Sequence, residues 1–328
     1  MRKTARTMMA RTGLAALSVV LMGSIAARAE DAAQYPSKRI NLVVGFTAGG
    51  FADTLARTIG QKLQEKWGQS VTIDNRAGAG GNTAAKHVAG AAPDGYTILV
   101  TTTALAINET LYKQRDYQLS ELTAIAMPGS SSESLAVHPS KPSGSLKEFL
   151  EWAKDREITY GTAGVGSGSH LAAEYFFKVL AKTKANHVPF RGGALSVQAA
   201  VGNQIDVVAL SFGSGPQVNE GKLKGLAVAG VERSIAMPQV RTFAEGGFPG
   251  FVAESWVGFF VPSKTDPAII EKLNAAINEM ITGGETKQHL TGLGYQLTAR
   301  SVADSNKYLT SEVENWGTMV KAVGITIE

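Results

Sequence analysis

Strand-like and helix-like segments alternate along this chain, and their order limits the folds that it can adopt. Short continuous apolar runs predict buried strands, and apolar side chains at helical spacing predict the intervening helices. In the first part of the chain, strands are expected at residues 39–46, 70–74 and 96–101 and helices at 54–67 and 82–91. Strands that alternate with helices predict a mostly parallel sheet with helices on both faces, and therefore an α/β fold.

The same pattern restarts after a loop and predicts a second α/β unit. It contains strands at residues 157–160, 185–189 and 205–210 and helices at 170–180 and 195–202, while helices at 267–281 and 302–323 follow it. Residues 134–138 and 255–261 are expected to connect the two units. We therefore predict domain 1 from residues 30–134 plus 255–328 and domain 2 from residues 135–254. Two crossing segments form a hinge, with a ligand in the cleft between the domains.

The first 29 residues predict an export signal. A basic start is followed by an apolar run from Gly13 to Ala26 and by the small-x-small pattern Ala27-Arg28-Ala29, which is typical of a signal peptide cleaved after Ala29. The run is short for a membrane span, although an uncleaved anchor is the alternative. With no Cys there is no lipid attachment site, so we expect a protein free in the periplasm.

The charge balance changes once this segment is removed. The full chain has a formal net charge of +4, but the residues after position 29 carry 27 basic and 28 acidic side chains, a net charge of −1. Nucleic-acid binding depends on clustered Lys and Arg. The composition therefore argues against a nucleic-acid partner.

Candidate ligand-binding residues lie in glycine-rich turns that follow strands, because ligands of open α/β sheets bind beyond the carboxyl ends of the strands. Backbone N–H groups and the positive end of the following helix suit a carboxylate or phosphate there. The first turn and the strand end near it contribute Phe46, Thr47, Ala48, Gly49, Gly50, Phe51, Asp53, Thr102 and Thr103. The second turn and the next strand end contribute Thr162, Gly164, Val165, Gly166, Ser167, Ser169, His170, Arg191 and Gly192.

Several of these residues have a structural alternative. Asp53 is more typical of a residue that stabilises a helix N-terminus than of a catalytic acid. The second turn could be a flexible loop with a capping Ser, and His170 could contact a ligand or only cap the helix. Arg191 could pair with a carboxylate, although a single Arg often forms a surface ion pair.

The sequence lacks the usual signatures of catalysis. Gly164-x-Gly166-x-Gly168 does not have the dinucleotide-binding spacing, and no Ser lies in a G-x-S-x-G motif. The five His show no H-E-x-x-H motif. We therefore expect no catalytic residue, metal or cofactor, and we favour a binding protein over the alternative, an exported α/β enzyme that acts on a small anion.

Ordered motifs along the mature chain resemble one known family. They include Tyr35-Pro36-Ser37-Lys38-Arg39-Ile40, Gly49-Gly50 with Asp53 and Arg57, Asn75-Arg76-x-Gly78-Ala79-Gly80-Gly81-Asn82, Pro93-Asp94-Gly95-Tyr96-Thr97, Val188-Pro189-Phe190-Arg191-Gly192 and Ser255-Trp256-x-Gly258. The chain thus resembles the Bug-type solute-binding proteins of tripartite tricarboxylate transporters. The resemblance implies a two-domain periplasmic Venus flytrap fold (type II), and a monomer that delivers a small carboxylate to a membrane permease. It also implies that the two glycine-rich turns hold the ligand, partly through water.

The chain departs from the family pattern at positions that affect the ligand. It has Gly45 and Phe51 where the family commonly has Pro or Ser, and Ser211-Phe212-Gly213-Ser214 where an Asp often occurs. Loss of that Asp, which suits an amino group, argues against an amino-acid ligand. Phe51 and Phe212 would suit a flat body between polar ends, as in terephthalate, unless both rings pack in the core.

Overall fold

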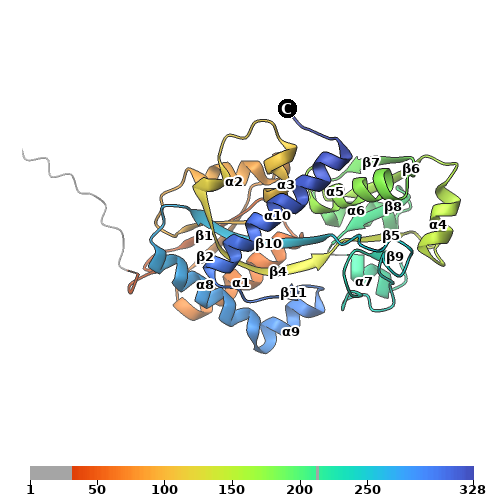
Figure 1. The fold of residues 1–328 in the computed structure, drawn as a ribbon. Helices are drawn as coiled ribbons and strands as arrows, with labels where there is room; N and C mark the ends of the chain where they lie inside the picture. The colour runs from red at the N-terminus through yellow and green to blue at the C-terminus, as the bar shows by residue number, and fades with distance from the viewer. Residues whose placement is uncertain (1–31, 212–213) are drawn as a thin grey trace, which may run out of the picture.

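The computed structural model describes residues 32–211 and 214–328, which form two β-sheets lying side by side (Figure 1). The predicted signal peptide and Phe212 lie outside the described residues. In spatial order the first sheet contains β11 (Gln296–Leu297), β4 (Leu122–Ser132), β10 (Glu254–Pro262), β3 (Thr97–Thr102), β1 (Ile40–Val44) and β2 (Val71–Asn75). The second contains β7 (Ala185–Pro189), β6 (Ile158–Thr162), β8 (Val207–Leu210), β5 (Ser134–Val137) and β9 (Lys224–Val228).

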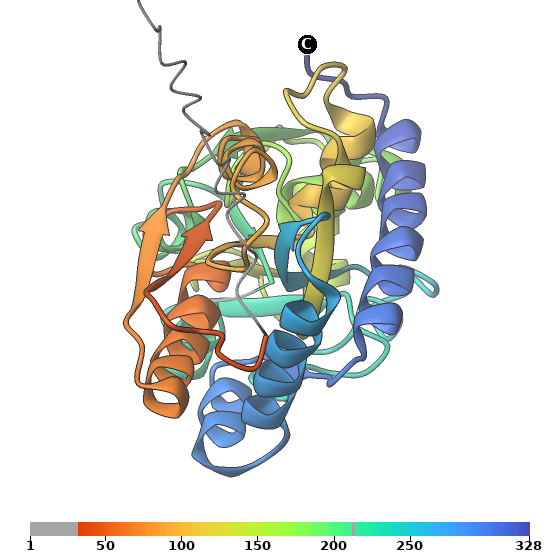
Figure 2. The ribbon, with the colours of Figure 1, turned by 90° about the vertical axis from the view of Figure 1, so that its left-hand side faces the viewer.

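Helices cover both faces of the first sheet, and together they form the first lobe (residues 32–132 and 254–328). On one face α1 and α8 bury apolar side chains against the strands, and on the other face α2, α3 and α10 do so. Figure 2 views this lobe from its outer end, with α10 along one side of the sheet. The helical elements are α1 (Phe51–Trp67), η1 (Ala79–Gly81), α2 (Asn82–Ala89), α3 (Ala104–Leu111), η2 (Leu119–Glu121), α8 (Pro267–Thr282), α9 (Gly284–Gly292) and α10 (Val302–Val323).

The second sheet and its helices form the second lobe (residues 134–228). Its helical elements are α4 (Leu146–Ala153), α5 (Gly168–Glu174), the π-helix η3 (Tyr175–Leu180), α6 (Gly193–Val201) and α7 (Ser214–Asn219). One apolar core continues from α2, α3 and α10 of the first lobe to α4, α5 and η3 of the second. A separate cluster lies under α6 and α7. The lobes are therefore in contact along one side as well as at their connections.

Local sequence signals explain where the longer helices begin and end. In α1, Leu55, Ile59 and Leu63 recur at helical spacing and are buried, and the helix stops at Gly68, whose φ of 67° is left-handed. The α8 helix starts at Pro267, and the preceding Asp266 side chain accepts a hydrogen bond from the backbone N–H of Ala268.

The two connections between the lobes meet at one point. The chain leaves the first sheet at Glu133, between β4 and β5, and returns through residues 229–253. The Ala229 N–H donates to the Glu133 carbonyl (2.7 Å), the Glu133 N–H to the Ala253 carbonyl (2.9 Å) and the Ala253 N–H to the Ala229 carbonyl (2.8 Å). This ring of backbone bonds ties the outgoing and returning segments together.

The structure corrects the predicted strand pairing. The pairs β1–β2, β1–β3, β6–β7 and β6–β8 are parallel as expected, but both sheets are mixed rather than mostly parallel. The antiparallel strands come from the two connecting segments: residues 134–138 lie almost wholly in β5 of the second sheet, and 255–261 lie in β10 of the first. These segments therefore flank the crossing instead of forming it, because each strand pairs along its full length within one sheet.

Periodicity also missed or misplaced several elements. Residues 104–132 contain α3 and the long strand β4; most of α3 is buried, including the polar Asn108, so it gave no clear periodic signal. The helix expected at 170–180 begins earlier, at Gly168, and its second half is the π-helix η3. Within the described ranges, no helix is long and apolar enough to cross a membrane.

Candidate functional site

A cavity of about 300 Å³ lies between the two lobes, at the carboxyl ends of β1, β3, β6, β7 and β8. This is the edge where open α/β sheets bind ligands, and the volume suits a small molecule. The described lining residues carry no charged side chain. They are Phe46, Thr47, Gly49, Gly50, Phe51, Ala52, Thr102, Ala163, Ser167, Gly168, Ser169, Gly192, Gly193, Ala194, Val197, Gln198, Leu210, Ser211, Gln217 and Ser255.

Three helices begin at this cavity. Gly50 precedes α1, Ser167 precedes α5 and Gly192 precedes α6, and all three residues line the cavity. The first N–H groups of a helix have no partner within the helix, and the helix dipole places partial positive charge there. Positive potential at the cavity thus comes from backbone groups rather than from Lys or Arg, and it suits an anion.

Hydroxyl groups add hydrogen-bonding capacity beside these helix starts. The Ser167 hydroxyl donates to the Gly164 carbonyl (2.7 Å) and accepts from the His170 N–H (3.2 Å), so it is used in capping α5. Ser169 Oγ lies 3.0 Å from Ser167 Oγ and accepts from the Ala163 N–H (3.3 Å). Because the single hydrogen of Ser167 is used on Gly164, Ser169 is the donor in this pair, and its hydroxyl must rotate away from Ser167 to donate to a ligand.

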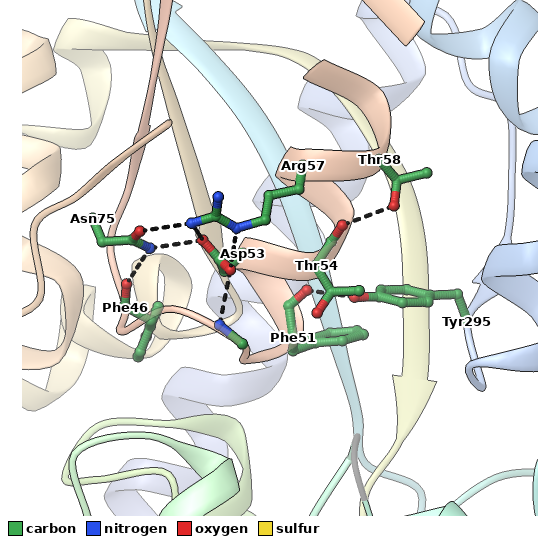
Figure 3. Close-up of polar contacts among 9 residues, drawn as sticks. Phe46, Phe51, Asp53, Thr54, Arg57, Thr58, Asn75 and Tyr295 are labelled. Carbon is green, nitrogen blue, oxygen red and sulfur yellow. Dashed lines mark hydrogen bonds and ion pairs between the residues drawn. The ribbon is translucent and has the colours of Figure 1, made fainter. Parts of the chain in front are cut away.

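A network centred on Asp53 shapes the first turn (Figure 3). Its carboxylate accepts hydrogen bonds from the Gly49 N–H (2.8 Å), Arg57 Nε (2.8 Å) and Asn75 Nδ2 (2.9 Å), and Asn75 also donates to the Phe46 carbonyl (2.9 Å). Burial alone would raise the pKa of Asp53, but the bonds from Arg57, Gly49 and Asn75 outweigh it and lower the pKa below 3.8. Asp53 is therefore an ionised anchor for the turn and lies below the cavity lining.

Aromatic rings form part of the cavity wall. The ring of Phe51 stacks on Tyr295 with the centroids 4.8 Å apart, and the Tyr295 hydroxyl donates to the Phe51 carbonyl (2.5 Å; Figure 3). Phe46 and Phe51 are each half-buried and line the cavity. Phe51 thus packs on the first lobe with one face and remains available to the cavity.

A stacked pair of imidazoles, one buried and one half-buried, supports the second turn from behind. His170 and His187 stack at 4.1 Å, the Gly166 N–H donates to His170 Nδ1 (3.3 Å), and His187 Nε2 lies 2.7 Å from the Thr162 hydroxyl. Burial lowers the pKa of His170 to about 3 and that of His187 to about 4. Both rings are neutral at ordinary pH and hold the shape of the turn.

In the structure, the candidate ligand-binding residues expected from sequence fall into three groups. Ten line the cavity: Phe46, Thr47, Gly49, Gly50, Phe51, Thr102, Ser167, Ser169, Gly192 and Ser211. Six lie behind the lining and support it: Asp53, Thr103, Thr162, Gly164, Gly166 and His170. The remaining described ones, Ala48, Val165 and Arg191, are exposed and outside the lining. The carbonyl of Arg191, not its guanidinium, contributes to the cleft by accepting a hydrogen bond from the Thr47 hydroxyl (2.8 Å).

Sequence reasoning missed part of the lining. Gly193, Ala194, Val197 and Gln198 belong to α6, which follows a parallel strand, so the same strand-turn-helix signal was available for them. Ser255 lies on the returning strand β10, and only tertiary structure brings it to the cavity. Across the described ranges, no cluster of three His, Asp or Glu side chains could hold a metal ion.

Two α/β lobes joined by two connections, with a solute-sized cavity between them, define the class of two-lobed periplasmic binding proteins. Residues 55–325 match the tripartite tricarboxylate transporter family receptor, and the chain belongs to that family. Its members are solute-binding receptors and not enzymes. The resemblance to Bug-type proteins is thereby confirmed.

Known relatives cover nearly the whole chain. Protein BugT of Bordetella pertussis is 30% identical over 324 residues, which are 96% of this chain and 98% of the relative. The structure of R. palustris Rpa4515 with adipate has a TM-score of 0.85 at 29% identity and covers 89% of this chain and 99% of that one. MatC (Rpa3494) from Rhodopseudomonas palustris with bound malate has a TM-score of 0.82 at 31% identity, with 87% and 100% covered.

Proposed function

We propose that this protein is a periplasmic receptor that captures a small di- or tricarboxylate in the cavity between its lobes and delivers it to a tripartite tricarboxylate-type permease. The observation that carries the proposal is the convergence of three helix N-termini on a cavity whose described lining has hydroxyls but no charged side chain. Such a site stabilises an anion through preorganised dipoles. The adipate and malate bound to two structural relatives support a carboxylate.

Capture is coupled to contact between the lobes. The Thr47 hydroxyl on the first lobe donates to the Arg191 carbonyl on the second (2.8 Å) beside the cavity. A ligand that bonds to α1 of one lobe and to α5 and α6 of the other stabilises the same closed arrangement. The division into domain 1 (30–134 plus 255–328) and domain 2 (135–254), export through residues 1–29 and a monomeric state are parts of the same proposal, with Ser134 assigned to the second sheet and Glu254 to the first.

The lining favours a ligand with an apolar body between carboxylates. Phe46 and Phe51 supply aromatic surface, and Val197 and Leu210 supply aliphatic surface. No described acidic side chain lines the cavity to pair with an ammonium group, so an amino acid is disfavoured. Terephthalate, with a flat ring between two carboxylates, is the specific candidate, and adipate is its flexible counterpart.

A thermal-shift screen with malate, adipate, terephthalate and glutamate tests the proposal. A ligand that binds only the native state raises the melting temperature and remains chemically unchanged. We expect at least one dicarboxylate to give a saturable rise and glutamate to give none. Ser169→Ala should weaken binding by about 1 kcal/mol, whereas Ser140→Ala, at an exposed position of the second lobe, should not. Absence of any shift with all carboxylates, or conversion of one of them, would contradict the receptor function.

A further inference from the structure

Glu133 is a buried acid at the crossing between the lobes, next to the cavity. It separates β4 from β5, and its backbone takes part in the ring of hydrogen bonds that joins the two connections. The residue is only 3% exposed. A carboxylic acid in this position is costly if it is ionised without partners, so its protonation state matters for the structure around it.

The side chain of Glu133 reaches the cavity through Ser255. Ser255 lines the cavity, and its Oγ donates a hydrogen bond to Glu133 Oε1 (2.5 Å). The second carboxyl oxygen, Oε2, has no hydrogen-bond partner among the described residues. Gly168, the first residue of α5, packs over this pair so closely that a Cβ there would lie 2.2 Å from Ser255 Oγ and 2.8 Å from Glu133 Oε1. The pair is therefore enclosed directly beneath the start of α5.

The surroundings favour the neutral acid. Burial raises the pKa of Glu133 to about 8, and the hydrogen bond with Ser255 opposes this only in part. Titratable or charged groups on the elements packed around it are His170 and Glu174 of α5, Glu254 of β10, Lys224 of β9, and Arg241 and Glu245 in the returning segment. None of these forms a described hydrogen bond or ion pair with Glu133, so no cation offsets its ionised form.

We propose that protonated Glu133 is a positioning residue that orients the Ser255 hydroxyl as a donor to the carboxylate of the bound solute, so that capture is linked to one proton. The inference rests on the proposed function. Protonation on Oε1 reverses the bond from Ser255 to Glu133, so that the acid donates and Ser255 Oγ accepts. Oε1 is favoured over Oε2 as the site of the proton because Oε2 has no hydrogen-bond partner among the described residues. Ser255, whose Oγ accepts this bond, then directs its own hydrogen into the cavity.

Ionisation of Glu133 reverses this arrangement. The carboxylate takes the hydrogen of Ser255 as acceptor, the serine presents only lone pairs to the solute, and a negative charge lies behind the binding site. Both changes weaken the binding of an anion. The ionised state would instead favour a ligand that offers a donor, such as an ammonium group.

Calorimetric titrations of the protein with adipate and terephthalate at pH 7 and pH 9 test the inference. The carboxyls of both ions are ionised at either pH, so a change in affinity reports on the protein. We expect the affinity to fall about tenfold between these pH values, because a group with a pKa of about 8 loses most of its proton over this interval. Binding at pH 9 should take up close to one proton, measured from the dependence of the enthalpy on the buffer.

Three variants separate positioning from a structural role. Glu133→Gln retains a donor to Ser255 and should bind within about threefold of wild type at pH 7 without the pH dependence. Ser255→Ala should lose about tenfold in affinity at pH 7, the equivalent of one hydrogen bond to a charged group, and also lose most of the pH dependence. Glu312→Gln is the matched control, since Glu312 is a buried acid with a raised pKa that bonds to Trp256 and Trp316. It should keep the wild-type pH dependence.

The outcomes distinguish this inference from the function on which it rests. The role of Glu133 is overturned, and the receptor function is not, if adipate or terephthalate binds with an affinity that is constant or rises between pH 7 and pH 9. The same holds if the Glu133→Gln variant keeps the wild-type pH dependence of affinity. If neither ion nor malate binds wild type at any pH, the receptor function fails and this inference fails with it. Should Glu133→Gln not fold, proton uptake by wild type decides the question.

Discussion

At the scale of residues, the candidate site depends on groups that hold backbone in place rather than on charged side chains that touch a ligand. Asp53 shows this most clearly. Its carboxylate fixes the N–H of Gly49 and, through Asn75, the carbonyl of Phe46, while Arg57 compensates its charge. Its position at the start of a helix was sufficient to predict an anchoring role from sequence, but its partner Asn75 is on the strand β2 and required the structure.

Asp53→Asn should lower the free energy of unfolding by about 1–3 kcal/mol, because a charged acceptor of several buried hydrogen bonds is lost. The pKa of folded Asp53 is lowered, so its contribution is present above its ordinary value of 3.8 and is lost as the pH falls through the folded value. Urea unfolding at neutral and acidic pH measures both effects. Asp74→Asn, which breaks only a surface pair with Arg76, should cost less than about 1 kcal/mol. Equal losses in the two variants would contradict the anchoring role.

At the scale of elements, the helix starts create the site, and glycine allows the lobes to approach there. The sequence predicted a helix after each of these turns, at residues 54–67, 170–180 and 195–202, and the observed helices α1, α5 and α6 each begin two or three residues earlier. Gly192 was a candidate ligand-binding residue, but its contact with the other lobe was not predicted. Gly192 has a φ of 116°, and a Cβ at this position would lie 2.3 Å from Thr47 Oγ1 on the other lobe. Glycine at the start of α6 is thus required by both the backbone and the contact across the cleft.

Gly192→Ala should therefore reduce both stability and ligand affinity. The unfavourable backbone conformation costs about 1–3 kcal/mol, and displacement of Thr47 removes the contact between the lobes, which we expect to lower affinity about tenfold. Gly68→Ala is the matched control, because Gly68 also has a positive φ but its Cβ would meet no atom within 4 Å. Denaturation together with calorimetry should show a stability loss in both variants and an affinity loss in Gly192→Ala alone.

At the scale of the whole molecule, the sequence predicted two α/β units and a chain that leaves the first sheet and returns to it. The position of the crossing could not be predicted, because β4 continues through the polar residues 129–132 up to Glu133, and nothing local marks Glu133 or residues 229–253 as the junction. The passage of α10 along α5 and η3 of the second lobe is likewise a tertiary contact without a local signal. Long-range pairing, and not local propensity, decides these features.

The bond between Thr47 and the Arg191 carbonyl should bias the molecule toward the closed arrangement. Thr47→Val removes this donor while it keeps the shape of the side chain, so we expect a larger radius of gyration in the absence of ligand and an affinity reduced about fivefold, corresponding to about 1 kcal/mol. Small-angle X-ray scattering and calorimetry measure the two effects. Thr58→Val, which removes a hydroxyl bond to the Thr54 carbonyl within α1, should change neither; a closed, wild-type profile for Thr47→Val would contradict the proposed bias.

The central claim is that helix N-termini and hydroxyls from both lobes bind one small carboxylate. A crystal structure of the protein with the dicarboxylate that gives the largest thermal shift tests it most directly. We expect the ligand in the cavity, with its carboxylate oxygens bonded directly or through one water to the first turns of α1 and α5 and to Ser169. A ligand bound elsewhere, or one held mainly by Lys or Arg side chains, would contradict it.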